Sequence, residues 1–199
     1  MTERKKIFNI IAPIYGLFYG YQRRKFARAI EKYKTNFDFT AFRSVLDVGC
    51  GTGALCAVLS ELGLAVTGVE PAEKMLEIAE KKTANKNIKL LQADALQGLP
   101  FADDSFELVI ASYVAHGLQK NERIKLYAEM SRVAQKRVII YDYNQNRSLL
   151  TTVVEWLEGG DYFRFIREAE EEMLEIFSEV RVIDVDTRAA WYICTPDKI

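Results

Sequence analysis

The sequence lacks a long hydrophobic run. No apolar stretch approaches the roughly 18 to 20 residues that a membrane-spanning helix needs. The charged start, residues 1–6, is not followed by the apolar block and small-residue cleavage site of a secretory signal. We therefore predict a cytoplasmic protein.

Histidine and cysteine are scarce. The chain has one histidine and three cysteines, and their spacing matches no metal-binding pattern: His116, Cys50, Cys56 and Cys194. An odd number of cysteines also argues against a disulfide framework. The sequence thus predicts reduced thiols and no metal site.

The sequence also lacks an overall excess of charge, but the charge is unevenly spread. The formal net charge of the 199 residues is −1. Residues 1–34 hold nine Lys or Arg against two Glu, a net charge of +7. Such a segment is either a solvated helix face or a weak contact with an anionic surface. We expect no nucleic-acid partner, and the oligomeric state stays open.

Length and composition indicate a single domain. With 49% hydrophobic and 28% charged residues, the chain resembles an ordinary globular protein and is long enough to bury a core. From residue 44 onward, short apolar runs alternate with amphipathic patterns, which predicts a parallel sheet with helices on both faces. The expected strands are 44–48, 64–69, 87–91, 106–111 and 137–142, with helices at 54–62, 72–84 and 121–134.

The two ends of the chain follow different patterns. Residues 2–12 and 15–34 read as two helices, because Pro13 should interrupt the pattern between them. Residues 162–177 form an acidic amphipathic pattern. The runs 179–185 and 188–194 predict a β-hairpin around Asp186 and Thr187.

The most informative stretch runs from Ser44 to Leu55. A short apolar strand stops at Gly49, Gly51 and Gly53, and a helical pattern follows at once. Glycines at such a junction let the backbone take positive φ angles and approach a ligand closely, and the first N–H groups of the helix can hold polar ligand groups. The stretch predicts a nucleotide-like ligand.

Two cofactor classes fit the glycines. Gly49, Gly51 and Ala54 satisfy the dinucleotide pattern, so an NAD(P)-dependent oxidoreductase is one alternative. Asp47, however, lies two residues before the first glycine, where its carboxylate would repel a pyrophosphate. The same carboxylate suits a ligand that carries an ammonium and a sulfonium group, which favours S-adenosyl-L-methionine.

Four ordered segments resemble the motifs of class I S-adenosylmethionine-dependent methyltransferases of the small-molecule type. The first is Asp47-Val48-Gly49-Cys50-Gly51-Thr52-Gly53, and the others span 66–71, 91–95 and 99–110. The resemblance covers residues 40–142. A shorter segment, 11–15, resembles the start of quinone-biosynthesis methyltransferases, in which this arm covers the cofactor and lines the acceptor pocket.

The resemblance implies a fold, a reaction and four parts of the single domain, 1–199. The fold is an α/β, Rossmann-like, doubly wound, seven-stranded and mostly parallel sheet with an antiparallel last strand. The reaction is in-line methyl transfer to a small-molecule acceptor, with S-adenosyl-L-homocysteine as product. The parts are a helical N-terminal arm or cap (1–40), a cofactor-binding core (41–142), a lid and helix (143–177) and a C-terminal β-hairpin (178–199).

The predicted cofactor residues lie where strands end. Asp47 would reach the ammonium group, Glu70 would accept from the ribose hydroxyls, and Asp94 and the N–H of Ala95 would contact the adenine. Each acid has a structural alternative, since Glu70 suits a helix start and Asp94 a cap. The full predicted set is Asp47, Gly49, Cys50, Gly51, Gly53, Glu70, Pro71, Asp94, Ala95 and Ser112.

Acceptor and catalytic residues are less defined by the sequence. His116 would suit a general base near neutral pH, and Tyr113 follows the fourth strand, where the family places the acceptor. Aromatic side chains that would shape a pocket, or simply pack in the core, are Tyr15, Tyr19, Tyr113 and Trp156. A third alternative is a cofactor-binding module that docks on an anionic partner.

Overall fold

The computed structural model describes residues 3–145 and 162–197. The chain divides into two compact units, Met1–Asp94 and Ala95–Ile199, which are described in turn. Trp156 and most of the predicted lid lie outside the described residues. The division of a single domain into four parts stays a prediction.

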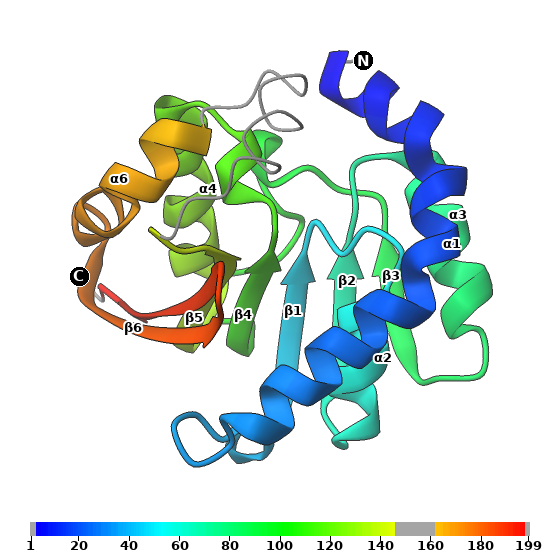
Figure 1. Cartoon of the computed structure of the whole chain (residues 1–199), viewed down its shortest axis with the longest axis horizontal. Helices are drawn as coiled ribbons and strands as arrows, with labels where there is room; N and C mark the ends of the chain where they lie inside the picture. The colour runs from blue at the N-terminus through cyan, green and yellow to red at the C-terminus, as the bar shows by residue number, and fades with distance from the viewer. Residues whose placement is uncertain (1–2, 146–161, 198–199) are drawn as a thin grey trace. The chain divides into compact units, whose positions relative to one another are not determined.

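The first unit is built on three parallel strands in the order β3-β2-β1 (Figure 1). Their bounds are β1 Ser44–Val48, β2 Ala65–Val69 and β3 Ile88–Leu91. Helices α2 (Ala54–Glu61) and α3 (Glu73–Thr83) connect them. Val48 pairs with Val69 and Val69 with Leu91, so the carboxyl ends of all three strands reach the same edge.

The N-terminal arm is one helix, α1 (Glu3–Lys32), and the predicted interruption at Pro13 is wrong. Proline removes one backbone hydrogen bond and costs about 3 kcal/mol inside a helix. Packing outweighs this cost, because Ala12 next to Pro13 is fully buried in a cluster with Ala72 and Met75 of the α3 region. Asn9 adds a contact: its side-chain oxygen accepts from the Lys74 backbone N–H at 3.0 Å, which caps the start of α3.

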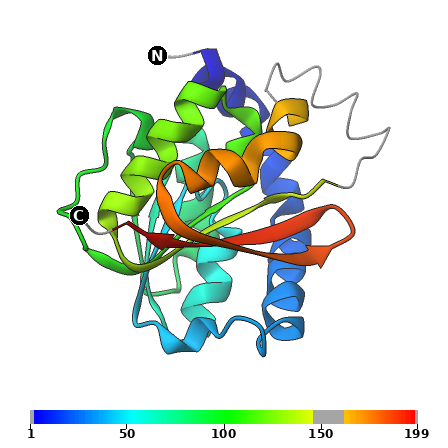
Figure 2. The same cartoon turned by 90° about the vertical axis from the view of Figure 1, so that its left-hand side faces the viewer.

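The described residues of the second unit form four strands in the order β4-β5-β7-β6. Strands β4 (Phe106–Ser112) and β5 (Ala134–Tyr143) are parallel, and β7 (Ala189–Pro196) runs antiparallel to β5 and to β6 (Phe177–Asp186). Helices α4 (Lys120–Val133) and α6 (Tyr162–Leu174) pack on this sheet and on each other, with α6 over the hairpin in Figure 2.

The predicted fold class is confirmed. The two units contribute seven strands, mostly parallel, with an antiparallel last strand and a helical N-terminal arm. The predicted hairpin at the end of the chain is also confirmed, with its turn between Asp186 and Ala189. None of the helices in residues 3–145 and 162–197 combines the length and the hydrophobicity that crossing a bilayer requires.

Candidate functional site

The loop between β1 and α2 requires its glycines. Gly51 and Gly53 have φ angles of 54° and 76°, in the left-handed region that other residues rarely adopt. A Cβ atom on Gly53 would lie 3.1 Å from the Thr83 side chain, whereas one on Gly51 would meet nothing within 4 Å. No side chain caps the first turn of α2 at Gly53. The loop therefore leaves open space beside the half-buried Gly51, and no side-chain cap occupies the start of the helix, where N–H groups can hold polar ligand groups.

Asp47 is a buried acid with unused bonding capacity. Its carboxylate is fully buried, and one oxygen, Oδ2, accepts from the Cys56 thiol at 3.2 Å. The other oxygen, Oδ1, has no hydrogen-bond partner among the described residues. Burial raises the pKa of Asp47 to about 7, with the charge of Glu70 adding to the rise and the thiol opposing it. A cationic ligand group would supply the missing partner.

Glu70 joins the loops that follow β1 and β2. Its Oε2 accepts from the Gly51 N–H at 3.0 Å and its Oε1 from the Ala72 N–H at 2.9 Å. Each carboxylate oxygen has two lone pairs, so Glu70 can still accept from ligand hydroxyls. Pro71 follows Glu70, and its carbonyl accepts from the Gln92 side chain at 3.3 Å. The half-buried Asp94 follows β3 and ends this unit.

These donors and acceptors fit one of the two predicted cofactor classes better than the other. S-adenosylmethionine offers an ammonium group for Asp47 and ribose hydroxyls for Glu70. A dinucleotide would place a pyrophosphate near two buried carboxylates, with no cation among Asp47, Glu70 and the loop to neutralise it. The first unit therefore supports the sulfonium cofactor.

The remaining predicted residues belong to the second unit. Ala95 begins a short 3₁₀ helix, Ala95–Gln97, and Ser112 ends β4. Tyr113 has a φ angle of 56°, a strained value for a non-glycine residue, and its N–H donates to the Tyr141 carbonyl at 2.8 Å. Its ring lies 5.3 Å from that of Tyr141, and burial raises the pKa of its hydroxyl.

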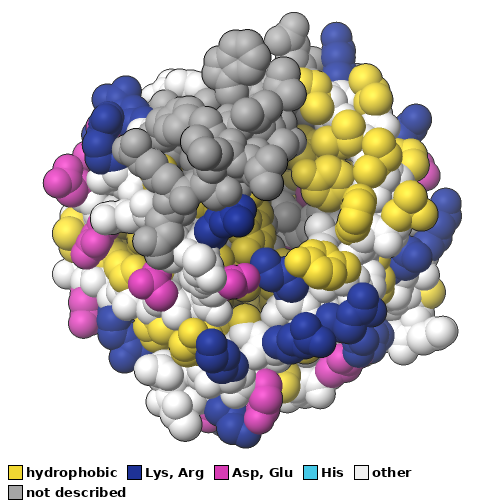
Figure 3. All heavy atoms as spheres, in the orientation of Figure 1, with side chains coloured by type: hydrophobic (Ala, Val, Ile, Leu, Met, Phe, Trp, Pro, Cys, Tyr) yellow, Lys and Arg dark blue, Asp and Glu magenta, His cyan; other side chains and the backbone are white. Residues whose placement is uncertain are grey.

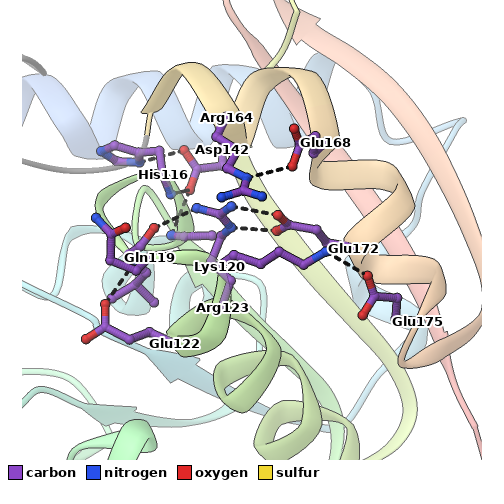
Figure 4. A network of polar contacts seen from close by, with 12 residues as sticks. His116, Gln119, Lys120, Glu122, Arg123, Asp142, Arg164, Glu168, Glu172 and Glu175 are labelled. Atoms are coloured by element: carbon purple, nitrogen blue, oxygen red, sulfur yellow. Dashed lines mark hydrogen bonds and ion pairs between the residues drawn. The ribbon is translucent and has the colours of Figure 1, made fainter.

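His116 is paired with an acid that the sequence analysis missed. Its Nδ1 lies 2.7 Å from Oδ1 of Asp142, which is fully buried near the end of β5 (Figure 4). The Asp142 carboxylate also accepts backbone N–H groups of Ala115, His116 and Tyr143 at 3.0, 3.3 and 2.8 Å. Because an ionised carboxylate only accepts, a neutral His116 carries its proton on Nδ1 and leaves Nε2 as the acceptor.

A second buried pair holds the segment that carries His116. Arg123 of α4 binds Glu172 of α6 through two hydrogen bonds, 2.6 Å from Nε and 2.7 Å from Nη2 (Figure 4). Its third nitrogen donates to the Leu118 carbonyl at 2.6 Å, two residues beyond His116. The bidentate pair thus fixes the turn before α4.

The predicted pocket tyrosines of the arm take part in packing. Tyr15 contacts the cluster around Ala12 and meets Phe8 edge to face, with ring centres 6.4 Å apart. The ring of Tyr19 lies 5.6 Å below the ammonium group of Lys82. A role for Tyr15, Tyr19 or Trp156 in an acceptor pocket stays a prediction.

The first unit combines a glycine loop after its first strand with buried acids at the ends of two strands, an arrangement that suits an adenosyl ligand. Comparisons with known proteins agree. Residues 45–137 match a family model described as a methyltransferase domain. The chain is 33% identical over 144 residues, 70% of its length, to an uncharacterized methyltransferase of Bacillus licheniformis. It is 44% identical over 73 residues, 34% of its length, to a demethylmenaquinone methyltransferase of Staphylococcus aureus.

These alignments span 66% of the Bacillus licheniformis protein and 30% of the Staphylococcus aureus protein. Among solved structures, a proposed S-adenosylmethionine-dependent methyltransferase of Methanococcus maripaludis has the same fold, with a TM-score of 0.74, 18% identity, and coverage of 100% of this chain and 98% of that one. The chain belongs to the class I S-adenosylmethionine-dependent methyltransferases, and S-adenosylmethionine is the cofactor of that family.

Proposed function

We propose that the chain transfers a methyl group from S-adenosylmethionine to a small-molecule acceptor. The observation that carries the proposal is the buried Oδ1 of Asp47, which has no partner among the described residues, beside the open backbone at Gly51. When bound, the cofactor supplies a methyl group that its sulfonium charge has already activated. No protein nucleophile is then needed, and positioning can lower much of the barrier.

Three features of the first unit would hold the cofactor. Asp47 would accept from its ammonium group, and Glu70 would accept from its ribose hydroxyls. The loop at Gly51 would lie against it without side-chain interference. Asp94, Pro71 and the second-unit residues Ala95 and Ser112 complete the proposed set.

His116 would remove a proton from the acceptor. A neutral O–H or N–H acceptor that gains a methyl group must lose its proton, and Nε2 of His116 can take it. Asp142 would hold the imidazole in the required tautomer and stabilise the imidazolium that forms. Asp142 is thus a positioning residue, and His116 is the proposed base.

An aromatic acceptor is the substrate class that best fits the second unit. The rings of Tyr113 and Tyr143 lie 6.4 and 4.8 Å from the imidazole of His116. Aromatic rings stack favourably on such surfaces. The likeness to a demethylmenaquinone methyltransferase, over 73 residues, supports a ring-shaped acceptor without identifying it.

Ligand binding separates the two cofactor classes. Thermal shift and titration calorimetry should show stabilisation by S-adenosylhomocysteine and none by NAD or NADP. Glu70→Gln should weaken S-adenosylhomocysteine binding by about tenfold, because a charged acceptor for the ribose hydroxyls is lost. Glu80→Gln, on the exposed face of α3, is the matched control. Stabilisation by a nicotinamide nucleotide alone would overturn the proposal.

A further inference from the structure

Helix α1 exposes a continuous apolar stripe. Leu17 is 84% exposed and Ile10 75%, and four more large apolar residues on the same side are about half exposed. Figure 3 shows hydrophobic side chains gathered in one patch over this helix. The stripe recurs every three or four residues, which is the helical period. Its members are Ile7, Ile10, Ile14, Leu17, Phe18 and Tyr21.

The stripe residues are each 47–84% exposed, so they lie largely outside the packed interior of the first unit. The opposite side of α1 packs against the first unit, since Ala12, Phe26 and Ile30 are buried. A helix that is apolar on its inner side only would suffice for the fold. An exposed apolar patch of this kind marks an interaction surface.

Basic side chains border the stripe. Further along α1, Arg24, Arg28 and Lys32 are exposed. On the other side, a shallow groove of about 370 Å³ lies between α1 and α3, and Leu17 belongs to both groove and stripe. Three lysines, Lys74, Lys81 and Lys82, and one acid, Glu77, line the groove. The remaining lining is apolar and consists of Ala12, Pro13, Gly16, Leu17 and Ile78. None of the three lysines forms an ion pair within the described residues.

We infer that this face of α1, with the adjoining groove, docks on an anionic lipid bilayer. The stripe would enter the boundary between headgroups and acyl chains, and the arginines and lysines would lie against lipid phosphates. The combination of exposed Leu and Phe with flanking basic residues is what an interfacial helix requires. This inference does not rest on the proposed methyl transfer.

A second copy of the chain is a poorer occupant of the same surface. Parallel pairing of two α1 helices would bring Arg24 and Arg28 of one copy against the same residues of the other, and like charges repel. Antiparallel pairing would place the basic ends on the apolar stripes and desolvate unpaired charges. An anionic bilayer offers acyl chains for the apolar stripe and phosphates for the basic side chains.

Vesicle sedimentation tests the inference on the full chain. The protein should sediment with vesicles of phosphatidylcholine containing about one-third phosphatidylglycerol, less with phosphatidylcholine alone, and less at high salt. The variant Ile10→Gln with Leu17→Gln should lower the vesicle affinity at least tenfold, since each leucine-sized side chain contributes about that much. The matched control is Leu174→Gln, an exposed leucine of α6 outside the surface.

Charge reversal tests the basic part. Lys81→Glu with Lys82→Glu should weaken binding to the phosphatidylglycerol vesicles by about tenfold or more, while Lys125→Glu on α4 should change little. Absence of sedimentation, or sedimentation that the stripe variant leaves unchanged, would overturn the inference. The inference would also be overturned if the chain formed a dimer in solution, the stripe variant dissociated that dimer, and no binding to vesicles was seen.

Titration with S-adenosylhomocysteine separates this result from the proposed function. All the surface variants should bind it as the unmodified chain does, because none of the substituted residues belongs to the proposed cofactor site. A chain that binds lipid but not S-adenosylhomocysteine would overturn the methyltransferase proposal and leave the docking surface standing.

Discussion

Among the residues that the structure describes, each unit buries one aspartate completely, and the two aspartates have opposite surroundings. Asp142 accepts three backbone N–H groups and the imidazole of His116. Asp47 accepts a single thiol, and its second oxygen has no partner within the described parts of the chain. A buried carboxylate without partners costs free energy, so such an arrangement persists where a ligand completes it. Asp142, whose carboxylate oxygens both accept hydrogen bonds, instead holds the residues around it in place.

Glu172, another buried acid of the second unit, also differs from Asp47 in having a complete set of partners. Glu172 is 1% exposed and binds Arg123, which is fully buried, through two hydrogen bonds. Within the second unit, the charge of buried Glu172 is therefore neutralised by Arg123 of the same unit. In the first unit, the Asp47 oxygen that has no hydrogen-bond partner among the described residues belongs to the strand that leads into the predicted cofactor loop. This position agrees with the proposed role of Asp47 in binding.

Breaking the Arg123–Glu172 pair should have the largest effect. Glu172→Ala leaves the Arg123 guanidinium buried without its counter-charge, and the free energy of unfolding should fall by about 3–5 kcal/mol. Urea unfolding followed by circular dichroism measures it. The matched control is Glu175→Ala, whose partner Lys120 lies 3.0 Å away at the surface. That change should cost less than about 1 kcal/mol. Equal losses in the two variants would contradict the internal pairing.

Asp142→Asn should affect the reaction rather than the cofactor. An asparagine amide can donate to Nδ1 of His116, which moves the imidazole proton to Nε2 and removes the acceptor. Once an acceptor substrate is found, kcat should fall about a hundredfold, with S-adenosylhomocysteine affinity unchanged. His116→Gln should show a loss of similar size.

Asp184→Asn is the control for that substitution. Asp184 is an acid of the same unit whose carboxylate accepts from Asn144 at 2.8 Å and has no contact with His116 among the hydrogen bonds of the described residues. It should leave kcat close to that of the unmodified chain. If Asp142→Asn retained the full rate, His116 would not be the base.

The sequence was sufficient to predict features whose cause is local. The Gly49–Gly53 loop and Glu70 follow from which residues stand at the end of a strand, so their positions could be predicted. The error at Pro13 arose because tertiary packing of Ala12 outweighed a local rule. The partner of His116 was missed because Asp142 lies 26 residues away and meets it only once β5 has formed. The sequence did hold one signal for this partner, because Asp142 is the single acid within the otherwise apolar run 138–143.

Asp47 should also make stability depend on pH. Its folded pKa of about 7 lies above the ordinary value of 3.8, so the folded chain binds the proton more tightly than the unfolded chain does. This contribution to stability is complete below about pH 4 and is lost as the pH rises to about 7. Urea unfolding should therefore show a decline over this range that is smaller in Asp47→Asn.

The same pKa predicts a tenfold change in cofactor affinity. The ammonium group of S-adenosylhomocysteine favours ionised Asp47, and at about pH 6 only about a tenth of the free chain has this carboxylate ionised. Calorimetry should show binding about tenfold weaker at about pH 6 than at about pH 8, with close to one proton released at the lower pH. Asp47→Asn should bind weakly with no such dependence. Affinity that stays constant or rises as the pH falls would show that Asp47 does not meet the ammonium group, and the contrast with Asp142 would then be one of packing alone.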